Sequence, residues 1–392
     1  MADNKVAIVG YYHGPRLGVG VYIDRLMSHL KLESENGTQI TFYTNKNTLA
    51  GIKSLSPDVK VVNSFWLNAG SIPAIFFTAI VFPLICYFQK VKVAVLLSNP
   101  IVLFRFAQTV SVIHDLNEFE VDSKYGVLRT YYRKKIMLKS ALRNSSTLIA
   151  ISRFVASQIA TFFPEVPEER INVIESGVEI QTVSNEQVDS VLRKHGLSYH
   201  GYFLVVGRID PHGKSLYEAV KLFRYLITYR EDCPDKLLFV GGINKSSREE
   251  ANKFLKFIKN DLELSTRVIY LGYVNNITLA SLYRGAMAVI FLSRNEGFGF
   301  PLIEAFGHGC PVIYNPACKV LHEHAEGAGI AITDEMLRNG SFDSARFESL
   351  YDPKSREELS VRMKTIASKY DWDRCALGYL DLFNRTASRN HD

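Results

Sequence analysis

The chain has 392 residues, more than one typical domain requires, so we expect two domains. Hydrophobic residues make up 47% and charged residues 22%, which excludes a disordered chain and allows a sizeable core. The net charge is +6, yet residues 1–150 hold 17 Lys and Arg against 9 Asp and Glu, so positive charge gathers in the first part of the chain.

Short apolar runs alternate with helical patterns along the chain, which predicts an α/β protein with doubly wound parallel sheets. In the first half we expect strands at 5–10, 39–44, 93–98, 110–115 and 147–152, with helices at 18–30 and 128–142. In the second half we expect strands at 202–208, 236–242, 268–274, 288–294 and 310–315, with helices at 216–229 and 247–262. Ligands of such sheets bind at the carboxyl ends of the strands, so two facing domains predict one cleft between them.

Residues 72–88 (IPAIFFTAIVFPLICYF) carry no charge, but they fall short of the about 20 residues of a spanning helix and contain two prolines. A buried helix and a contact with a membrane surface both stay open. Residues 129–143 (RTYYRKKIMLKSALR) hold six basic and no acidic side chains. They indicate either a solvated helix face or attraction to anionic lipid. Since no nucleic-acid-binding motif accompanies them, we expect no nucleic-acid partner.

The cysteine spacing and the amino-terminal sequence indicate in which cellular compartment the protein resides. The five scattered cysteines include no CxxC pair and no accompanying histidine cluster, so they predict neither a zinc site nor disulfides. The first residues lack the basic and apolar segments of a secretory signal. We therefore expect the reducing cytoplasm, with a peripheral contact to the membrane as a further prediction.

The loop NEGFGFP follows the strand at 288–294 and precedes a helix that Pro301 begins. Gly297 and Gly299 allow backbone amides to approach a ligand, and free N–H groups at a helix start attract phosphate. Glu296 lies beside this anion site, and Glu304 lies about one turn into the helix. Because carboxylates accept hydrogen bonds from hydroxyls, the pattern suits a nucleotide sugar; helix capping and solvation are the alternative.

Two further loops follow predicted strands. GRIDPHGK places Arg208 and Lys214 after the strand at 202–208, where they suit a diphosphate leaving group or stay surface cations. VIHDL places His114 at the end of another strand, where a catalytic and a structural role are equally open. Near the amino terminus, Gly18 and Gly20 lie in LGVGVY, which lacks the third glycine of a dinucleotide site and so argues against NAD.

The sequence Asp371-Trp372-Asp373 matches the D-x-D pattern that can hold a divalent cation. It precedes an amphipathic run, so we expect a helix cap instead. With Arg208, Lys214 and helix amides to neutralise phosphates, no metal or other cofactor is expected.

The segment LGYVNNITLASLYRGAMAVIFLSRNEGFGFPLIEAFGHGCPVI resembles the signature region of the family 4 glycosyltransferases, through E-G-F-G-x-P-x-x-E-A and G-x-P-V. VVGRIDPHGK resembles the family's phosphate loop, VIHDL its histidine loop, and LGVGVY a reduced form of its glycine loop. The resemblance implies the GT-B fold: two Rossmann-like domains and a last helix that crosses back onto the first domain. It also implies a metal-independent transfer with retention of anomeric configuration.

The same resemblance implies roles for single residues. Arg208 and Lys214 bind the diphosphate, Glu304 the ribose hydroxyls, and Glu296 and His114 the donor sugar. The loop Gly297-Phe298-Gly299 and the glycines Gly18 and Gly20 bring backbone near the phosphates and the transferred sugar, and Val274 lies where the base is read.

These observations predict an acceptor-side domain at 1–190, a nucleotide-sugar domain at 191–371 and a crossover helix at 372–392. The expected function is that of a retaining hexosyltransferase. It moves a hexose such as mannose from a nucleotide sugar to a saccharide or lipid-linked saccharide in cell-surface polysaccharide or lipopolysaccharide assembly. A sugar-nucleotide epimerase of the same fold and a non-catalytic sugar-nucleotide-binding protein are the alternatives. A phosphorylase is not expected, since no lysine suited to pyridoxal phosphate is evident.

Overall fold

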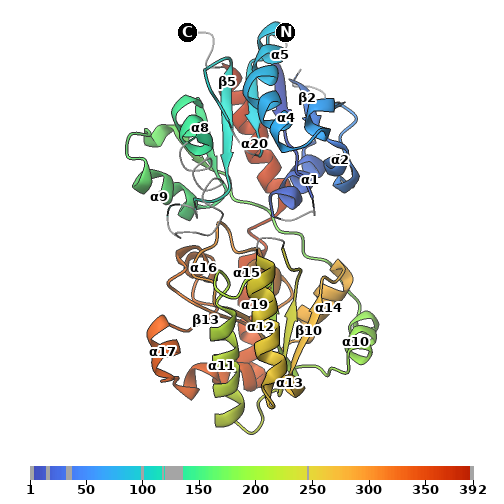
Figure 1. Ribbon diagram of the computed structural model, residues 1–392, viewed down its shortest axis with the longest axis vertical. Helices are drawn as coiled ribbons and strands as arrows, with labels where there is room; N and C mark the ends of the chain where they lie inside the picture. Colours follow the sequence, from blue (N-terminus) through green and yellow to red (C-terminus); the bar gives the residue numbers. More distant parts are fainter. Residues whose placement is uncertain are drawn as a thin grey trace. The chain divides into compact units, whose positions relative to one another are not determined.

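The computed structural model describes residues 4–14, 18–31, 38–98, 101–116, 119, 136–244 and 247–388. The chain forms two compact units, which we describe separately (Figure 1). Unit 1 consists of Met1–Gly177 and Asp371–Asp392, and unit 2 of Val178–Tyr370. The first boundary precedes the expected residue 190 because Arg284 of unit 2 holds the intervening segment. Its guanidinium donates to the carbonyl oxygen of Val183 at 2.6 Å and to the side chain of Asn185 at 2.8 Å.

The sheet of unit 1 has the strand order β3-β2-β1-β4-β5-β6-β7, and its pairings are parallel. Its strands are β1 (Asn4–Val9), β2 (Thr38–Thr44), β3 (Val59–Asn63), β4 (Val93–Leu96), β5 (Gln108–Ile113), β6 (Thr147–Ala150) and β7 (Ile171–Val173). The order reverses between β1 and β4, the switch point at which doubly wound sheets bind ligands.

The helices of unit 1 include segments from both ends of the sequence. They are α1 (Val19–His29), α2 (Lys46–Gly51), α3 (Phe65–Asn68), α4 (Ser71–Phe76), the π-helical η2 (Phe77–Val81), α5 (Phe82–Phe88), α8 (Lys139–Asn144), α9 (Arg153–Phe162), η4 (Glu168–Arg170) and α20 (Trp372–Ser388). Helix α20 packs on α1 (Figure 1), and the hydroxyls of Tyr22 and Tyr379 lie 2.6 Å apart in the core. The expectation that the last helix packs on the first domain is confirmed.

The uncharged run at 72–88 forms one continuous helix through α4, η2 and α5. Pro83 lacks an N–H to continue the α-helical ladder, and the turn before it widens into the π-helical η2. By length and composition Ser71–Phe88 could cross a membrane, and 39% of it is buried in the fold. Ala74, Phe77 and Phe82 pack into the core of unit 1. The helix is therefore a core helix with an exposed outer face.

The sheet of unit 2 has the order β10-β9-β8-β11-β12-β13, again with parallel pairings. Its strands are β8 (Tyr202–Val206), β9 (Lys236–Val240), β10 (Val268–Gly272), β11 (Ala288–Phe291), β12 (Val312–Tyr314) and β13 (Ile330–Ala331). Its helices are α10 (Asn185–Lys194), α11 (Leu216–Tyr229), α12 (Arg248–Asn260), α13 (Leu264–Arg267), α14 (Asn276–Gly285), α15 (Phe300–Gly307), α16 (Lys319–Ala325), α17 (Asp334–Asn339), η6 (Ser344–Phe347), α18 (Glu348–Tyr351) and α19 (Pro353–Ala367). Here the order reverses between β8 and β11.

An apolar core packs helices of unit 2 against this sheet. Phe223 of α11 and Phe254 of α12 are fully buried, and the rings of Phe254 and Phe239 of β9 lie 5.4 Å apart. In Figure 1, α11 and α12 run side by side over the sheet. The apolar stripes of α11 and α12 hold both helices on one face of the sheet. Each loop between a strand and one of these helices is therefore anchored at both of its ends.

The ten predicted strands are confirmed, although most end earlier than expected because glycine and polar loops begin inside the predicted ranges. The pattern missed β3, β7 and β13, which are edge strands. The predicted helix at 128–142 lies partly outside the described residues, and α8 occupies its end.

The attachment of α20 can be tested by replacing Tyr379 with Ala. The change removes a fully buried ring and its bond to Tyr22, so we expect a loss of about 3–5 kcal/mol in the free energy of unfolding. Leu377→Ala on the exposed face of the same helix is the control and should change the stability by less than about 0.5 kcal/mol. Equal effects of both variants on chemical denaturation contradict the packing described here.

Candidate functional site

The predicted site residues of unit 2 gather at the switch point of its sheet. Arg208 and Lys214 lie in the loop after β8, and Glu296 lies in the loop after β11. Strands β8 and β11 are neighbours in a parallel sheet, so the two loops leave the same edge side by side. The topology therefore brings the predicted cations and the first predicted carboxylate together.

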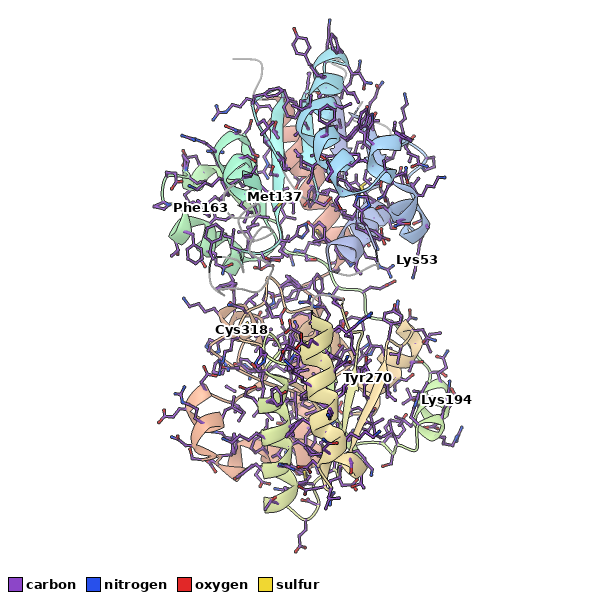
Figure 2. The ribbon with its side chains drawn as sticks, viewed as in Figure 1. Lys53, Met137, Phe163, Lys194, Tyr270 and Cys318 are labelled. Atoms are coloured by element: carbon purple, nitrogen blue, oxygen red, sulfur yellow. The ribbon has the colours of Figure 1, made fainter. Side chains whose placement is uncertain are left out.

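Lys214 and Glu296 form an ion pair between these two loops. Their side chains are 18% and 15% exposed, and the Lys214 ammonium lies 5.5 Å from the centre of the Phe291 ring. Cys318 (Figure 2) lies nearby, where burial and the Glu296 charge raise the pKa of its thiol to about 12, which keeps it neutral. Because the pair is shielded from water, it fixes the two loops relative to each other more firmly than a surface pair could.

Close backbone packing holds the loop after β8. The Gly207 N–H donates to the carbonyl oxygen of Val240 at 2.9 Å, and the Ile209 N–H to that of Gly242 at 3.0 Å. Gly241 has φ 146°, and a Cβ there would lie 1.8 Å from the Gly207 oxygen. The hydroxyl of Tyr270 (Figure 2) donates to the Gly241 carbonyl oxygen at 3.0 Å. Glycine is required at Gly241 because two loops meet backbone to backbone.

Arg208 is held loosely by comparison. Its guanidinium lies 3.7 Å from the Asp210 carboxylate, and its side chain is 31% exposed. Asp210 instead accepts a bond from the Gly213 N–H at 3.0 Å, which shapes the loop. Arg208 can thus direct most of its donors to an anion at this edge of the sheet.

The start of α15 belongs to the same candidate site. Gly299 is its N-cap with φ 86°, and a Cβ there would lie 2.5 Å from Leu321. No cap side chain accepts from the first turn, in which the Leu302 N–H donates to the Gly299 carbonyl oxygen at 3.0 Å. The glycines Gly297 and Gly299 flank Phe298, which is buried, so this loop offers backbone rather than side chains. Such a helix start attracts phosphate or another anion.

His324 packs against Phe298 of this loop. His324 was not predicted from the sequence as part of the site. Its ring lies 4.8 Å from the Phe298 ring and 4.9 Å from the Tyr370 ring. Burial lowers the pKa of His324 to about 4, so the imidazole is neutral near pH 7. A histidine in an apolar helical stretch gives no sequence signal for such a support, because its neighbours come from distant parts of the chain.

Glu304, the second predicted carboxylate, is half-buried on α15 and accepts a hydrogen bond from the Tyr283 hydroxyl of α14 at 2.8 Å. Burial raises the pKa of Glu304, and the Tyr283 bond opposes that rise. The Tyr283 ring stacks on His308 at 5.6 Å with an interplanar angle of 14°. Sequence reasoning missed Tyr283, because a tyrosine on a buried helical stripe looks like an ordinary core residue.

Val274 lies after β10, two strands away from β8 in the sheet. Gly272 at the end of β10 has φ 69°, and Tyr273 next to it is 78% exposed. The turn therefore presents backbone and one aromatic ring at the same edge of the sheet as the loop after β8.

Unit 1 carries the remaining predicted residues. Gly18 is the N-cap of α1 with φ 34°, and a Cβ on Gly20 would lie 2.9 Å from the Tyr12 ring. His114 follows β5; its Nε2 lies 2.8 Å from the Leu97 carbonyl oxygen, and its ring contacts Tyr22 edge-on at 4.8 Å. Because a carbonyl can only accept, Nε2 carries a proton.

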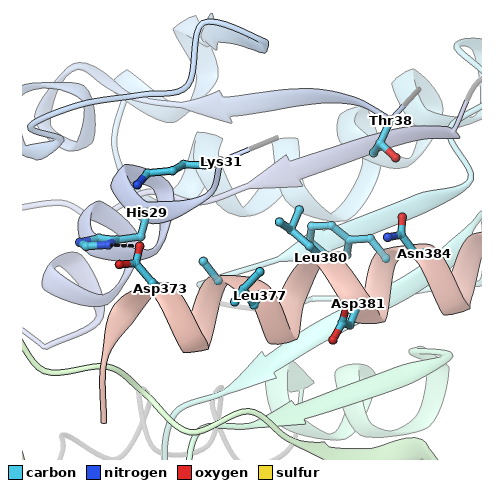
Figure 3. A pocket seen from close by; sticks show the side chains of 10 residues that line it. His29, Lys31, Thr38, Asp373, Leu377, Leu380, Asp381 and Asn384 are labelled. Carbon is cyan, nitrogen blue, oxygen red and sulfur yellow. Dashed lines mark hydrogen bonds and ion pairs between the residues drawn. The ribbon is translucent and has the colours of Figure 1, made fainter. Parts of the chain in front are cut away.

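The D-x-D pattern has structural roles. Asp371 accepts a bond from the Arg374 N–H at 2.8 Å, which confirms the predicted cap of α20. Asp373 pairs with His29 at 2.9 Å, and this pair borders a cavity of about 440 Å³ in unit 1 (Figure 3). The cavity includes none of the predicted site residues. Within the described ranges, no three His, Cys, Asp or Glu side chains form a group that could hold a metal ion.

Comparisons of the sequence agree with the geometry of unit 2. Residues 192–337 match the family model of the group 1 glycosyl transferases. The chain is 25% identical over 277 residues to an O-antigen chain mannosyltransferase B of Escherichia coli, covering 69% of this chain and 68% of that one. It is 27% identical over 267 residues to the O-antigen chain mannosyltransferase RfbU of Salmonella typhimurium, covering 68% and 66%. The alignments thus span about two thirds of each relative.

Solved structures share the architecture over nearly the whole chain. HepE of Anabaena, solved with UDP and glucose, matches with a TM-score of 0.71 at 15% identity, covering 97% of this chain and 99% of that one. WaaG, described as a glycosyltransferase of lipopolysaccharide biosynthesis, matches with a TM-score of 0.66 at 15% identity, covering 96% and 99%. These matches confirm the expected fold of two Rossmann-like domains.

The backbone contact under the candidate site can be tested with two neighbouring glycines. Gly241→Ala places a Cβ against the Gly207 carbonyl in a left-handed conformation, and we expect a loss of more than about 2 kcal/mol in unfolding free energy. Gly242→Ala is the control, since a Cβ there meets nothing within 4 Å. If thermal denaturation finds the two variants equally stable, the close approach of these loops is wrong.

Proposed function

Because the chain is a glycosyltransferase of the GT-B kind, we propose that it is a retaining hexosyltransferase that takes its sugar from a nucleoside-diphosphate donor. The observation that carries the proposal is the meeting of Arg208, Lys214 and Glu296 at the switch point of unit 2, beside the uncapped start of α15. This edge offers positive charge and the positive end of a helix next to carboxylates, as a diphosphate flanked by hydroxyls requires.

In the proposed complex, Arg208 and the first turn of α15 bind the diphosphate, and Glu304 accepts bonds from the ribose hydroxyls. Lys214 has three donor hydrogens, so its ammonium can keep Glu296 as a partner while it binds a phosphate oxygen. The ion pair then places the Glu296 carboxylate next to the phosphate that carries the sugar. Glu296 is therefore the residue we assign to the sugar hydroxyls.

The proposed reaction exchanges one bond at the anomeric carbon. The bond from this carbon to the diphosphate oxygen breaks, the acceptor oxygen bonds to the carbon on the same face, and the acceptor proton moves to the departing phosphate. Arg208 and Lys214 stabilise the negative charge that develops on the leaving group. Because these cations and the helix amides supply the positive charge, we propose that no metal is required.

We propose mannose as the first sugar to test and a saccharide or lipid-linked saccharide of a surface polysaccharide as the acceptor. The support is that two relatives are O-antigen mannosyltransferases. The free cysteines at Cys86, Cys233, Cys310, Cys318 and Cys375 fit a reducing compartment, so we propose the cytoplasm as the location.

We also propose that unit 1 contacts an anionic membrane. Phe65, Trp66 and Phe76, here called the aromatic patch, are exposed on α3 and α4, and the Trp66 and Phe76 rings lie 5.5 Å apart. Tyr87 and Phe88 are exposed at the end of α5. Aromatic rings on a monotopic protein favour the membrane interface, and the basic residues of the first 150 positions favour anionic lipid. Residues 129–135 of the predicted basic helix lie outside the described residues.

The donor site can be tested by a thermal-shift screen with UDP-, GDP-, ADP- and dTDP-sugars, followed by transfer assays on the donor that binds. We expect Arg208→Ala and Glu296→Gln each to lower kcat/KM about 100-fold or more, because each removes a charge from the reacting region. Lys253→Ala, in an exposed ion pair on α12, is the control and should leave transfer unchanged.

Wild-type rates in both site variants contradict the assignment of these residues. Product that forms from the nucleotide sugar alone identifies an epimerase, and tight binding without turnover on any acceptor identifies a binding protein.

The membrane contact can be tested by co-sedimentation with vesicles that contain phosphatidylglycerol at low salt. The double variant Phe65→Ser/Phe76→Ser should lower the bound fraction several-fold, because it removes two exposed rings from the aromatic patch. Leu262→Ser, which changes an exposed apolar side chain of unit 2, is the control. Wild-type protein that stays in the supernatant, or equal sedimentation of all variants, overturns the membrane contact and leaves the donor chemistry intact.

A further inference from the structure

We infer that Tyr283 is a positioning residue for donor recognition: its hydroxyl orients the Glu304 carboxylate, so that one carboxylate oxygen points to the ribose of a nucleoside diphosphate. This inference rests on the proposed function, because it assumes that Glu304 binds the donor. It adds a residue that acts through Glu304 and does not itself touch the ligand.

The two oxygens of the Glu304 carboxylate have different roles in this arrangement. The Tyr283 hydroxyl donates to Oε2 of Glu304 at 2.8 Å, and Oε1 is the other acceptor of the same group. Tyr283 is 1% exposed, whereas Glu304 is half-buried and keeps contact with solvent. A carboxylate held by one oxygen loses its rotational freedom, so the other oxygen is preorganised to accept from a hydroxyl.

The Tyr283 ring is itself held in place. It stacks on His308 of α15 at 5.6 Å, close to parallel. Burial lowers the pKa of His308 to about 4, and the nearby charges of Arg284 and Lys364 act in the same direction. His308 is therefore neutral near pH 7 and supplies no cation for Glu304, which leaves the Tyr283 hydroxyl to offset the burial of this carboxylate.

The protonation states follow from the same surroundings. Burial, with the Glu304 charge adding to it, raises the pKa of Tyr283 well above its usual value, so the hydroxyl keeps its proton. Burial also raises the pKa of Cys310, which faces Tyr283, to about 12. Loss of the Tyr283 hydroxyl leaves burial of Glu304 unopposed and moves its titration to higher pH. The carboxylate then protonates at a pH where the wild-type site still accepts bonds.

Tyr202, the first residue of β8, offers a matched control. The Tyr202 hydroxyl, also fully buried, donates to the carbonyl oxygen of Leu282 at 2.7 Å, next to Tyr283 in sequence. Each variant removes one hydrogen bond of a buried hydroxyl. Tyr202→Phe removes the bond to the Leu282 carbonyl oxygen of α14, and Tyr283→Phe removes the bond to the Glu304 carboxylate of α15. Only the Tyr283 bond ends on the carboxylate that the ligand uses.

The experiment is calorimetric titration of UDP and of GDP, taking whichever binds wild-type protein, between pH 5 and pH 9. We expect Tyr283→Phe to raise Kd about tenfold, as for a lost bond to a charged group, with a loss that grows as the pH falls. The pH at which affinity falls to half should move upward. Tyr202→Phe should keep the wild-type Kd within about twofold and keep the wild-type pH profile. Equal Kd values and equal profiles for Tyr283→Phe and wild type overturn the inference.

A second comparison does not depend on the folding of the single variant. If Tyr283 acts through Glu304, adding Tyr283→Phe to Glu304→Gln changes Kd by less than about twofold. A further tenfold loss in the double variant overturns the inference. Failure of both UDP and GDP to bind wild-type protein overturns the proposed function and this inference together, whereas binding without an effect of Tyr283 overturns this inference alone.

Discussion

The ion pair between Lys214 and Glu296 is the interaction on which the candidate site depends. It joins the loops that leave β8 and β11, the two strands at which the order of the sheet in unit 2 reverses. Neighbouring parallel strands supply the two loops at one edge, and the shielded pair fixes their distance. We propose that Arg208, the start of α15 and Glu304 lie around this pair, so that an anion bound there meets both cations and acceptors.

Buried aromatic contacts give this edge its rigidity. Phe298 lies against His324 and Tyr370 beneath the loop of Gly297 and Gly299, and Tyr283 lies against His308 beneath Glu304. In both places the imidazole is neutral near pH 7, because burial lowers its pKa to about 4. The site therefore has two layers: polar groups that can meet a ligand, and packed rings that hold them without adding charge.

Sequence reasoning identified most of the fold, since apolar runs of parallel strands and glycine loops at their ends are local signals. The central strands and helix α11 were predicted correctly. The edge strands β3, β7 and β13 were missed because they are short or partly exposed. The candidate site residues Arg208, Lys214 and Glu296 were predicted from their places after strands. Their contacts were not predicted, because the Lys214–Glu296 pair and the Tyr283–Glu304 bond join residues 82 and 21 positions apart, which no local pattern encodes.

We propose that unit 2 binds the diphosphate of its donor at the edge formed by the loops after β8 and β11. The most direct measurement is transverse-relaxation-optimised NMR of the amide-labelled protein during titration with the nucleoside diphosphate that binds. We expect the largest chemical-shift changes at the amides of Gly207, Gly297, Phe298 and Gly299, and smaller changes near Val274. Saturable binding that leaves these amides unchanged and moves resonances elsewhere contradicts it.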